Sequence, residues 1–246
     1  MNQTIPAQNI SAHSDQHCCN CNLHSLCMAV SLDMTELSKL DDIVDRSKPL
    51  SKGQTLSAQG DKFQSVYAIK TGSVKTYTTS CSGEEQITGF YFPGDLIGLN
   101  GIDTGICPDS IKILETTTVC QVQFEQLDML SVELPKLRRQ LLKTMSKEIC
   151  NEQHMLQLLA KKNADERIAT FLIRLSNRFK VRGFSESRFR LSMSRHEIGN
   201  YLGLTVETVS RVLTRLQKNG LITVENKEIE ILDSKALLKL SNGKED

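Results

Sequence analysis

The residues best suited to chemistry in this 246-residue chain are its eight cysteines, which are unevenly placed. Cys18, Cys19, Cys21 and Cys27 lie within ten residues, whereas the other four are scattered, at Cys81, Cys107, Cys120 and Cys150. The N-terminal residues are polar and lack the basic and apolar segments of a signal peptide, so we expect a cytoplasmic protein with reduced thiols. Clustered cysteines in a reducing compartment are more often metal ligands or redox groups than structural disulfides.

The spacing Cys18-x2-Cys21-x5-Cys27 supplies three thiolates for one metal centre, and a fourth ligand has to come from elsewhere. This spacing matches neither common ferredoxin pattern, but an iron–sulfur cluster with four cysteine ligands can take one of them from a remote position. Zinc is an alternative because four cysteines also suit a closed structural zinc site. Free thiols in a polar tail are a third interpretation. Spacing by itself does not distinguish an iron–sulfur cluster from zinc.

Two capped helical patterns near the C-terminus predict a helix-turn-helix. Ser194-Arg-His-Glu197 is a capping-box sequence, Gly203 allows a sharp turn, and Thr205 can cap the next helix. Three polar side chains near the N-terminal end of that helix are spaced i, i+3 and i+4: Glu207, Ser210 and Arg211. In such motifs this end reaches the major groove, where an arginine can bridge guanine O6 and N7 and a glutamate can accept from cytosine N4. We therefore expect these three residues to read DNA sequence.

The surroundings of this motif favour DNA binding over an ordinary helical hairpin with a solvated face. Residues 164–220 contain 11 Lys/Arg and 5 Asp/Glu, a local charge of +6 in a chain of net charge +1. Apolar residues alternate on both sides of an Asn226-Lys227 turn, which predicts a β-hairpin wing, and Asp233 can cap a final helix over residues 234–240. The basic side chains available for phosphate contacts are Arg188, Arg190, Arg195, Arg215 and Lys218.

The first half of the chain has a different pattern. Residues 1–17 are polar and without periodicity, which predicts disorder, and residues 34–45 predict a short helix. From about Leu50 to Phe124, short runs rich in β-branched and aromatic residues are separated by glycines. The predicted strands cover residues 65–69, 74–79, 86–92 and 119–124. This pattern is typical of a small all-β sandwich or barrel.

Between these halves, residues 136–161 predict one long helix, and residues 164–179 predict a second, amphipathic one. Steps of three and four residues define a heptad seam on the long helix: Leu142, Met145, Ile149, Glu152, Leu156 and Leu159. The seam predicts a dimeric coiled coil, although a helix that buries one side against its own domain would give a similar stripe. Glu152 would place two carboxylates near each other across the dimer axis, so we expect a marginally stable dimer.

Over nearly its whole length the sequence resembles the CRP/FNR superfamily of bacterial regulators, and specifically its FNR (fumarate and nitrate reduction) branch of oxygen sensors. The resemblance rests on the Cys18/Cys21/Cys27 spacing and on four runs: KGQ at 52–54, EQITGF at 85–90, LETTTVC at 114–120 and GNYLGLTVETVSR at 199–211. It implies an α+β fold with an N-terminal β-roll sensor domain, a long dimerisation helix and a C-terminal winged helix-turn-helix domain. The expected boundaries are a cluster-binding arm over 1–28, the β-roll over 29–133, the helix over 134–162 and the DNA-binding domain over 163–246.

The resemblance also implies one [4Fe–4S] cluster per subunit, ligated by Cys18, Cys21, Cys27 and, from the β domain, Cys120. Cluster-containing homodimers of such proteins bind palindromic promoter sites with the half-site TTGAT. The resemblance implies that Glu207, Ser210 and Arg211 read that half-site. Oxygen degrades the cluster through a [2Fe–2S] form to the apoprotein, and the dimer dissociates. RNA polymerase is an expected partner, with surface loops such as residues 80–85 as candidate contacts.

We expect neither a bound cyclic nucleotide nor a membrane-spanning segment. Cyclic-nucleotide-binding relatives hold the phosphate with an arginine after a Gly-Glu turn, whereas Gly94-Asp95 is followed by no arginine as far as Val119. No apolar stretch is long enough to span a membrane. An enzyme is not expected either, because the chain has no phosphate-binding glycine-rich loop and no nucleophile-elbow sequence.

A zinc- or thiol-based regulator with the same DNA-binding half is the alternative to an iron–sulfur regulator. Cys19 could replace a ligand, and Cys81, Cys107 and Cys150 are expected to be inert.

Overall fold

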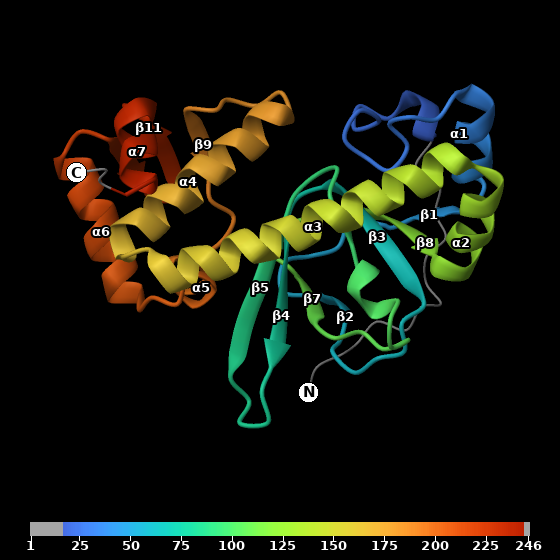
Figure 1. The fold of residues 1–246 in the computed structure, drawn as a ribbon, viewed down its shortest axis with the longest axis horizontal. Helices are drawn as coiled ribbons and strands as arrows, with labels where there is room; N and C mark the ends of the chain where they lie inside the picture. The colour runs from blue at the N-terminus through green and yellow to red at the C-terminus, as the bar shows by residue number, and fades with distance from the viewer. Residues whose placement is uncertain (1–16, 244–246) are drawn as a thin grey trace. The chain divides into compact units, whose positions relative to one another are not determined.

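Two antiparallel four-stranded sheets form the first half of the chain in the computed structural model, which describes residues 17–243 (Figure 1). One sheet has the order β1-β8-β3-β6 and the other β2-β7-β4-β5. Their strands are β1 (Val44–Arg46), β2 (Thr55–Ser57), β3 (Ser65–Thr71), β4 (Val74–Thr79), β5 (Glu85–Tyr91), β6 (Leu96–Ile97), β7 (Ser110–Ile113) and β8 (Thr118–Gln123). The four predicted strands are confirmed, with ends shifted by two residues at most. Except for His17, the predicted disorder of residues 1–17 falls outside the described residues.

β-Branched side chains fill the space between the sheets. One hydrophobic cluster consists of Ile69, Val74, Ile97, Ile111, Ile113 and Val119, each at most 3% exposed. Successive side chains of a strand point to opposite faces, so alternate β-branched residues of each strand meet in one core. The chain therefore forms the β-roll of a cyclic-nucleotide-binding type of domain, as expected.

Short helices close one end of this β-roll. Helix α1 (Met34–Asp41) buries Leu37 and Leu40 in a second core, together with residues of β3, β8 and helix α2 (Phe124–Glu133). The predicted helix over residues 34–45 was too long, because the chain from Val44 pairs with β8 instead of continuing the helix. A single 3₁₀ turn (Cys18–Asn20) and a series of turns precede α1. Another 3₁₀ turn, Leu99–Gly101, follows β6.

The predicted long helix is α3 (Pro135–Lys161), and proline is well suited to its first turn. Its apolar side chains form two groups. Leu137 and Leu158 are buried within the chain, at 0% and 3% exposure, whereas Leu142, Ile149 and Leu156 are 59%, 56% and 69% exposed. These last three seam residues are therefore available to a partner, whereas Met145 of the seam is half-buried. The chain divides into two compact units within α3, the first ending at Ile149 and the second beginning at Cys150.

The second unit is a three-stranded sheet with four further helices. These are α4 (Ala164–Val181), β9 (Arg188–Arg190), α5 (Arg195–Leu202), α6 (Val206–Lys218), β10 (Ile222–Glu225), β11 (Glu228–Ile231) and α7 (Ser234–Ser241). The predicted hairpin is β10 and β11, with Asn226 in its turn at a φ of 58°. The predicted helix over residues 164–179 continues two residues further. Strand β9, which pairs with β11, was not predicted because three residues are too short to show a period of two.

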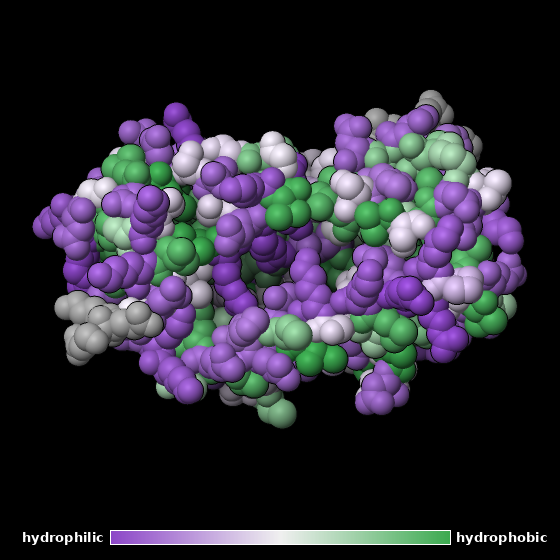
Figure 2. Space-filling model, turned by 45° about the horizontal axis from the view of Figure 1, so that its top comes forward, coloured by the Kyte–Doolittle hydropathy of each residue, from purple (hydrophilic) through white to green (hydrophobic). Residues whose placement is uncertain are grey.

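No helix among residues 17–243 is both long enough and apolar enough to span a membrane. On the face seen in Figure 2, hydrophilic side chains predominate and hydrophobic ones form separate patches.

Candidate DNA interface and cysteine site

The helix-turn-helix is built from the capping residues that the sequence indicated. The Ser194 side chain accepts from the Glu197 backbone N–H at 3.2 Å, and the Glu197 carboxylate accepts from the Ser194 backbone N–H at 2.8 Å. Gly203 ends α5 in the left-handed region at a φ of 63°. A Cβ at Gly199 would lie 2.6 Å from the carbonyl oxygen of Leu204, so only glycine permits this close approach of α5 to the turn.

Helix α6 has one buried face and one exposed polar face. Its buried side chains are Val209, Val212, Leu213 and Leu216. On the other face Glu207 and Arg211 are exposed and Ser210 is half-buried. The Arg211 guanidinium donates to the Thr208 hydroxyl at 3.2 Å. Hydrogen bonds from its own backbone N–H and from Thr205, at the positive end of the helix dipole, lower the pKa of Glu207, and the Arg211 charge adds to this. The three predicted base-reading residues therefore share one accessible surface.

The predicted phosphate-contacting cations are all exposed, but they do not have the same environment. Arg195 donates to the Ser210 hydroxyl at 3.2 Å and so lies beside the predicted reading face. Arg188 and Arg190 flank the buried Phe189 on β9. Arg215 forms an ion pair with Asp165 of α4. The charge of Arg215 is thus partly neutralised, and no local sequence pattern indicated this pairing.

Arg167 is a structural residue that sequence reasoning missed. Its guanidinium donates to the carbonyl oxygens of Leu159 at 2.8 Å, Lys162 at 2.9 Å and Leu202 at 2.9 Å. Those carbonyls belong to the C-terminal ends of α3 and α5, where helices leave acceptors without intrahelical partners. Arg167 therefore connects the end of α3 to the first helix of the motif. The sequence shows only an arginine on an amphipathic helix.

Three of the four predicted cysteine ligands pack against the same hydrophobic core. These are Cys18 and Cys27 from the N-terminal segment and Cys120 from β8. The thiol of Cys120 raises the pKa of both Cys18 and Cys27, and Cys21 acts in the same direction on Cys27 and Cys120. Burial is the largest cause in each case, and it raises the pKa of Cys27 to about 11. The four thiols are thus electrostatic neighbours.

Proximity does not amount to a formed metal site in this structure. Among residues 17–243, no three His, Cys, Asp or Glu side chains come together in a group that could hold a metal ion. All eight cysteines are free thiols. Cys19, Cys81 and Cys150 are exposed, and Cys107 contacts the Ser57 hydroxyl at 3.2 Å.

The segment between Cys21 and Cys27 is folded against the β-roll. The Cys27 backbone N–H donates to the Leu23 carbonyl at 2.9 Å, and the His24 backbone N–H donates to the Cys21 carbonyl at 3.0 Å. Leu26 packs closely against Gly94, where an added Cβ would lie 2.7 Å from the Leu26 Cβ. The Nε2 atom of His24 is buried and has no hydrogen-bond partner within the described part of the chain. A buried unsatisfied ring nitrogen costs free energy unless another group occupies the space beside it.

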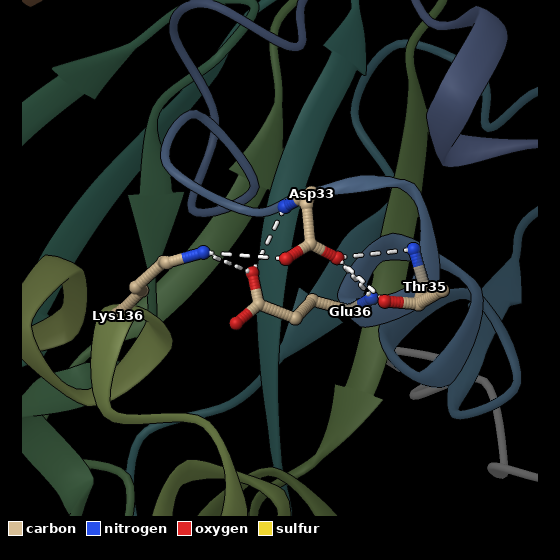
Figure 3. Close-up of polar contacts among 4 residues, drawn as sticks. All are labelled: Asp33, Thr35, Glu36 and Lys136. Atoms are coloured by element: carbon tan, nitrogen blue, oxygen red, sulfur yellow. Dashed lines mark hydrogen bonds and ion pairs between the residues drawn. The ribbon is translucent and has the colours of Figure 1, made fainter.

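The segment that follows is tied to the first turn of α3 (Figure 3). Asp33 caps α1, and its Oδ1 accepts from the backbone N–H groups of Thr35 at 3.1 Å and Glu36 at 3.0 Å. Lys136 Nζ lies 3.3 Å from the Asp33 carboxylate and 2.9 Å from that of Glu36. Hydrogen bonds from Thr35 and Glu36 hold the pKa of Asp33 below its usual range, and Lys136 contributes further. This contact connects the end of the cysteine-containing segment to the helix that carries the heptad seam.

Comparison with known proteins agrees with this architecture. Residues 47–132 match the family model of a cyclic nucleotide-binding domain, and residues 166–240 match that of a Crp-like helix-turn-helix domain. Among solved structures, FixK2 from Bradyrhizobium japonicum is 28% identical with a TM-score of 0.73, covering 80% of this chain and 97% of that one. A CooA variant from Carboxydothermus hydrogenoformans, 20% identical with a TM-score of 0.67, has the same fold.

Curated relatives are more similar in sequence. The transcriptional activator protein FnrA of Stutzerimonas stutzeri is 56% identical over 234 residues, which is 95% of this chain and 96% of that protein. The fumarate and nitrate reduction regulatory protein of Escherichia coli K12 is 50% identical over 225 residues, 92% of this chain and 90% of that protein. This chain therefore belongs to the FNR branch of the CRP/FNR family of transcription regulators, and it is a DNA-binding protein and not an enzyme.

Proposed function

We propose that this protein is an oxygen-responsive transcription regulator that binds palindromic TTGAT-type promoter sites as a homodimer carrying one [4Fe–4S] cluster per subunit. Oxygen destroys the cluster, the dimer dissociates, and DNA binding is lost. The observation that carries the proposal is the packing of Cys18 and Cys27, from the N-terminal segment, and Cys120, from β8, against the same hydrophobic core. The names of the relatives, which include a regulator of fumarate and nitrate reduction, support an anaerobic role.

The residues around Cys120 suit such a cluster. Cys18, Cys21, Cys27 and Cys120 would be its ligands, and four thiolates form a donor set that iron–sulfur clusters take in proteins. The buried Nε2 of His24, which no described side chain satisfies, could donate to a sulfur atom there. When bound, the cluster supplies an oxygen-sensitive connection between the N-terminal segment and β8. Loss of that connection leaves the segment held by its remaining contacts, which include Leu26 against Gly94 and the ion pairs of Asp33 and Glu36 with Lys136.

Loss of the cluster would affect the dimer through helix α3. Asp33 and Glu36 hold Lys136 in the first turn of this helix, so a shift of the preceding segment acts directly on the helix start. Further along, the predicted seam exposes Leu142, Ile149 and Leu156, which a second copy of the chain would bury. Glu152 is exposed on the same side and would bring two carboxylates together across the axis. A dimer weakened in this way is one whose population a modest structural change can decide.

DNA affinity would follow dimerisation because one helix-turn-helix contacts one half-site only. Two linked motifs add their binding free energies with little further entropic cost. In each motif Glu207, Ser210 and Arg211 would contact bases. The exposed arginines of β9, together with Arg195 and Lys218, would contact phosphates. RNA polymerase is a proposed partner and the cytoplasm the proposed location, and no cyclic nucleotide is proposed as a ligand.

Anaerobic purification of the full chain tests the proposal. We expect a brown protein with about four irons and four acid-labile sulfides per chain. It should be dimeric, should bind a palindromic TTGAT site, and should become colourless, monomeric and unable to bind on exposure to air. A colourless anaerobic protein that contains zinc would refute the proposal and would favour a zinc- or thiol-based regulator with the same DNA-binding half.

A further inference from the structure

A partly buried carboxylate–guanidinium pair lies directly beside Cys18, outside the predicted ligand set. Asp41, the last residue of α1, and Arg46, the last residue of β1, form an ion pair in which the two side chains are 14% and 16% exposed. The Asp41 carboxylate also accepts from the backbone N–H of Cys18 at 2.8 Å and lies 2.5 Å from His17 Nδ1. A charged carboxylate is therefore fixed at the first cysteine.

Arg46 stands between two of the proposed ligands. Its Nη2 lies 3.8 Å from the Cys18 Sγ, and strand pairing between β1 and β8 places Arg46 opposite Cys120. The guanidinium is thus the cation that faces the thiol of Cys18, with Cys120 as its cross-strand neighbour.

The two members of the pair have opposite effects on a thiolate at Cys18. Arg46 places a positive charge 3.8 Å from the Cys18 Sγ, whereas Asp41, bound to the Cys18 backbone N–H and paired with Arg46, places a negative charge at the same residue. A metal ligand has to be deprotonated, so a nearby cation favours ligation and a nearby carboxylate disfavours it. The backbone contact of Asp41 nevertheless fixes the position of Cys18. The Asp41 side chain therefore orients Cys18 and, through its negative charge, also weakens the Cys18 thiolate as a metal ligand.

We propose that Arg46 and Asp41 are opposed positioning residues that set how long the Cys18 thiolate retains its metal centre, with Arg46 prolonging and Asp41 shortening retention. This inference rests on the proposed function, because it concerns one of the proposed ligands of the cluster. Arg46 and Asp41 would thus control how readily the metal centre is lost. A sensor needs a metal centre that can be lost, whereas a structural metal site does not.

The test compares cluster loss from the full-length wild type, Asp41→Asn, Arg46→Gln and Arg46→Lys, all purified anaerobically. Loss is followed by visible absorbance after addition of an iron chelator, and iron and sulfide are counted at the start. Asn keeps an oxygen that can accept from the Cys18 backbone N–H but removes the like charge. We expect Asp41→Asn to lose the cluster about threefold to tenfold more slowly, Arg46→Gln to lose it faster by a similar factor, and Arg46→Lys to fall between Arg46→Gln and wild type.

The opposite signs distinguish this proposal from a purely structural role. Both Asp41→Asn and Arg46→Gln break the same ion pair, so a structural role predicts faster loss in both. Because Asp41→Asn is nearly isosteric, it decides the sign even if Arg46→Gln does not fold. A rate for Asp41→Asn that equals or exceeds that of wild type overturns the proposal. Lys39→Met breaks another ion pair of α1, with Glu133, and is the control expected to leave the rate unchanged.

Failure of the proposed function has a different signature. A wild type that holds zinc and no iron refutes the cluster, but the same order of metal release among the variants would still support the inference. An iron-containing wild type with variants that shift in one direction only refutes the inference and leaves the proposed function intact.

Discussion

Truncation of Leu156 to alanine should weaken the proposed dimer by an amount that follows from its exposure. In the single chain this side chain is 69% exposed and lies on the predicted seam of α3. Complete burial of a leucine side chain contributes about 1.5–3 kcal/mol, so burial of the exposed part contributes about 1–2 kcal/mol. Each dimer contains two copies, and alanine retains part of the contact. We therefore expect a loss of about 2–3 kcal/mol per dimer, which corresponds to a roughly 30- to 150-fold higher dissociation constant.

Sedimentation velocity over a concentration series measures this constant directly. The samples should be anaerobic and should contain equal iron, so that cluster occupancy does not contribute to the difference. Gln157→Ala is the matched control, because Gln157 is an exposed neighbour on the same helix but outside the seam. Circular dichroism should show that α3 is intact in both variants. If Leu156→Ala dimerises as tightly as Gln157→Ala, α3 does not form the dimer interface and the exposed stripe has another role.

Further predictions concern the charge in the seam, the DNA-reading face and the thiols. Glu152→Ala would remove the two like charges that the proposed dimer brings together, so it should strengthen the dimer in air; gel filtration that shows this variant as monomeric as wild type would contradict the role of Glu152. Arg211→Ala should relax the preference at one base pair in competition binding, whereas Lys218→Ala should weaken specific and scrambled DNA alike; equal losses for Arg211→Ala would remove Arg211 from the reading set. In the metal-free protein, iodoacetamide at mildly alkaline pH should modify exposed Cys19, Cys81 and Cys150 before Cys27, whose pKa burial raises to about 11. Peptide mass mapping tests that order, and early modification of Cys27 would show that its thiol is not buried in solution.

Features that depend on neighbouring residues in the chain could be predicted from the sequence. The capping box at Ser194 and the left-handed glycine at Gly203 are interactions within one or two turns, and both are present as expected. The hairpin turn at Asn226 and the cap at Asp233 are equally local. The continuous helix α3 was predictable because its period extends over many turns. Such patterns identify elements and their exposed faces, since the periods of a helix and of a strand are fixed by backbone geometry.

Other features depend on which distant segments pair, and these required the tertiary structure. The position of Arg46 opposite Cys120 follows from the register of β1 and β8, which are more than seventy residues apart. The contact of Asp41 with Cys18, the ion pair of Arg215 with Asp165 and the pairing of β9 with β11 have the same origin. A lone charged residue or a three-residue strand carries no periodic signal of its own. The sequence by itself therefore determined the longer elements and the three clustered cysteines. The long-range packing of the β-roll decided which charges surround these cysteines, because electrostatic interactions depend on distance in space and not on separation along the chain.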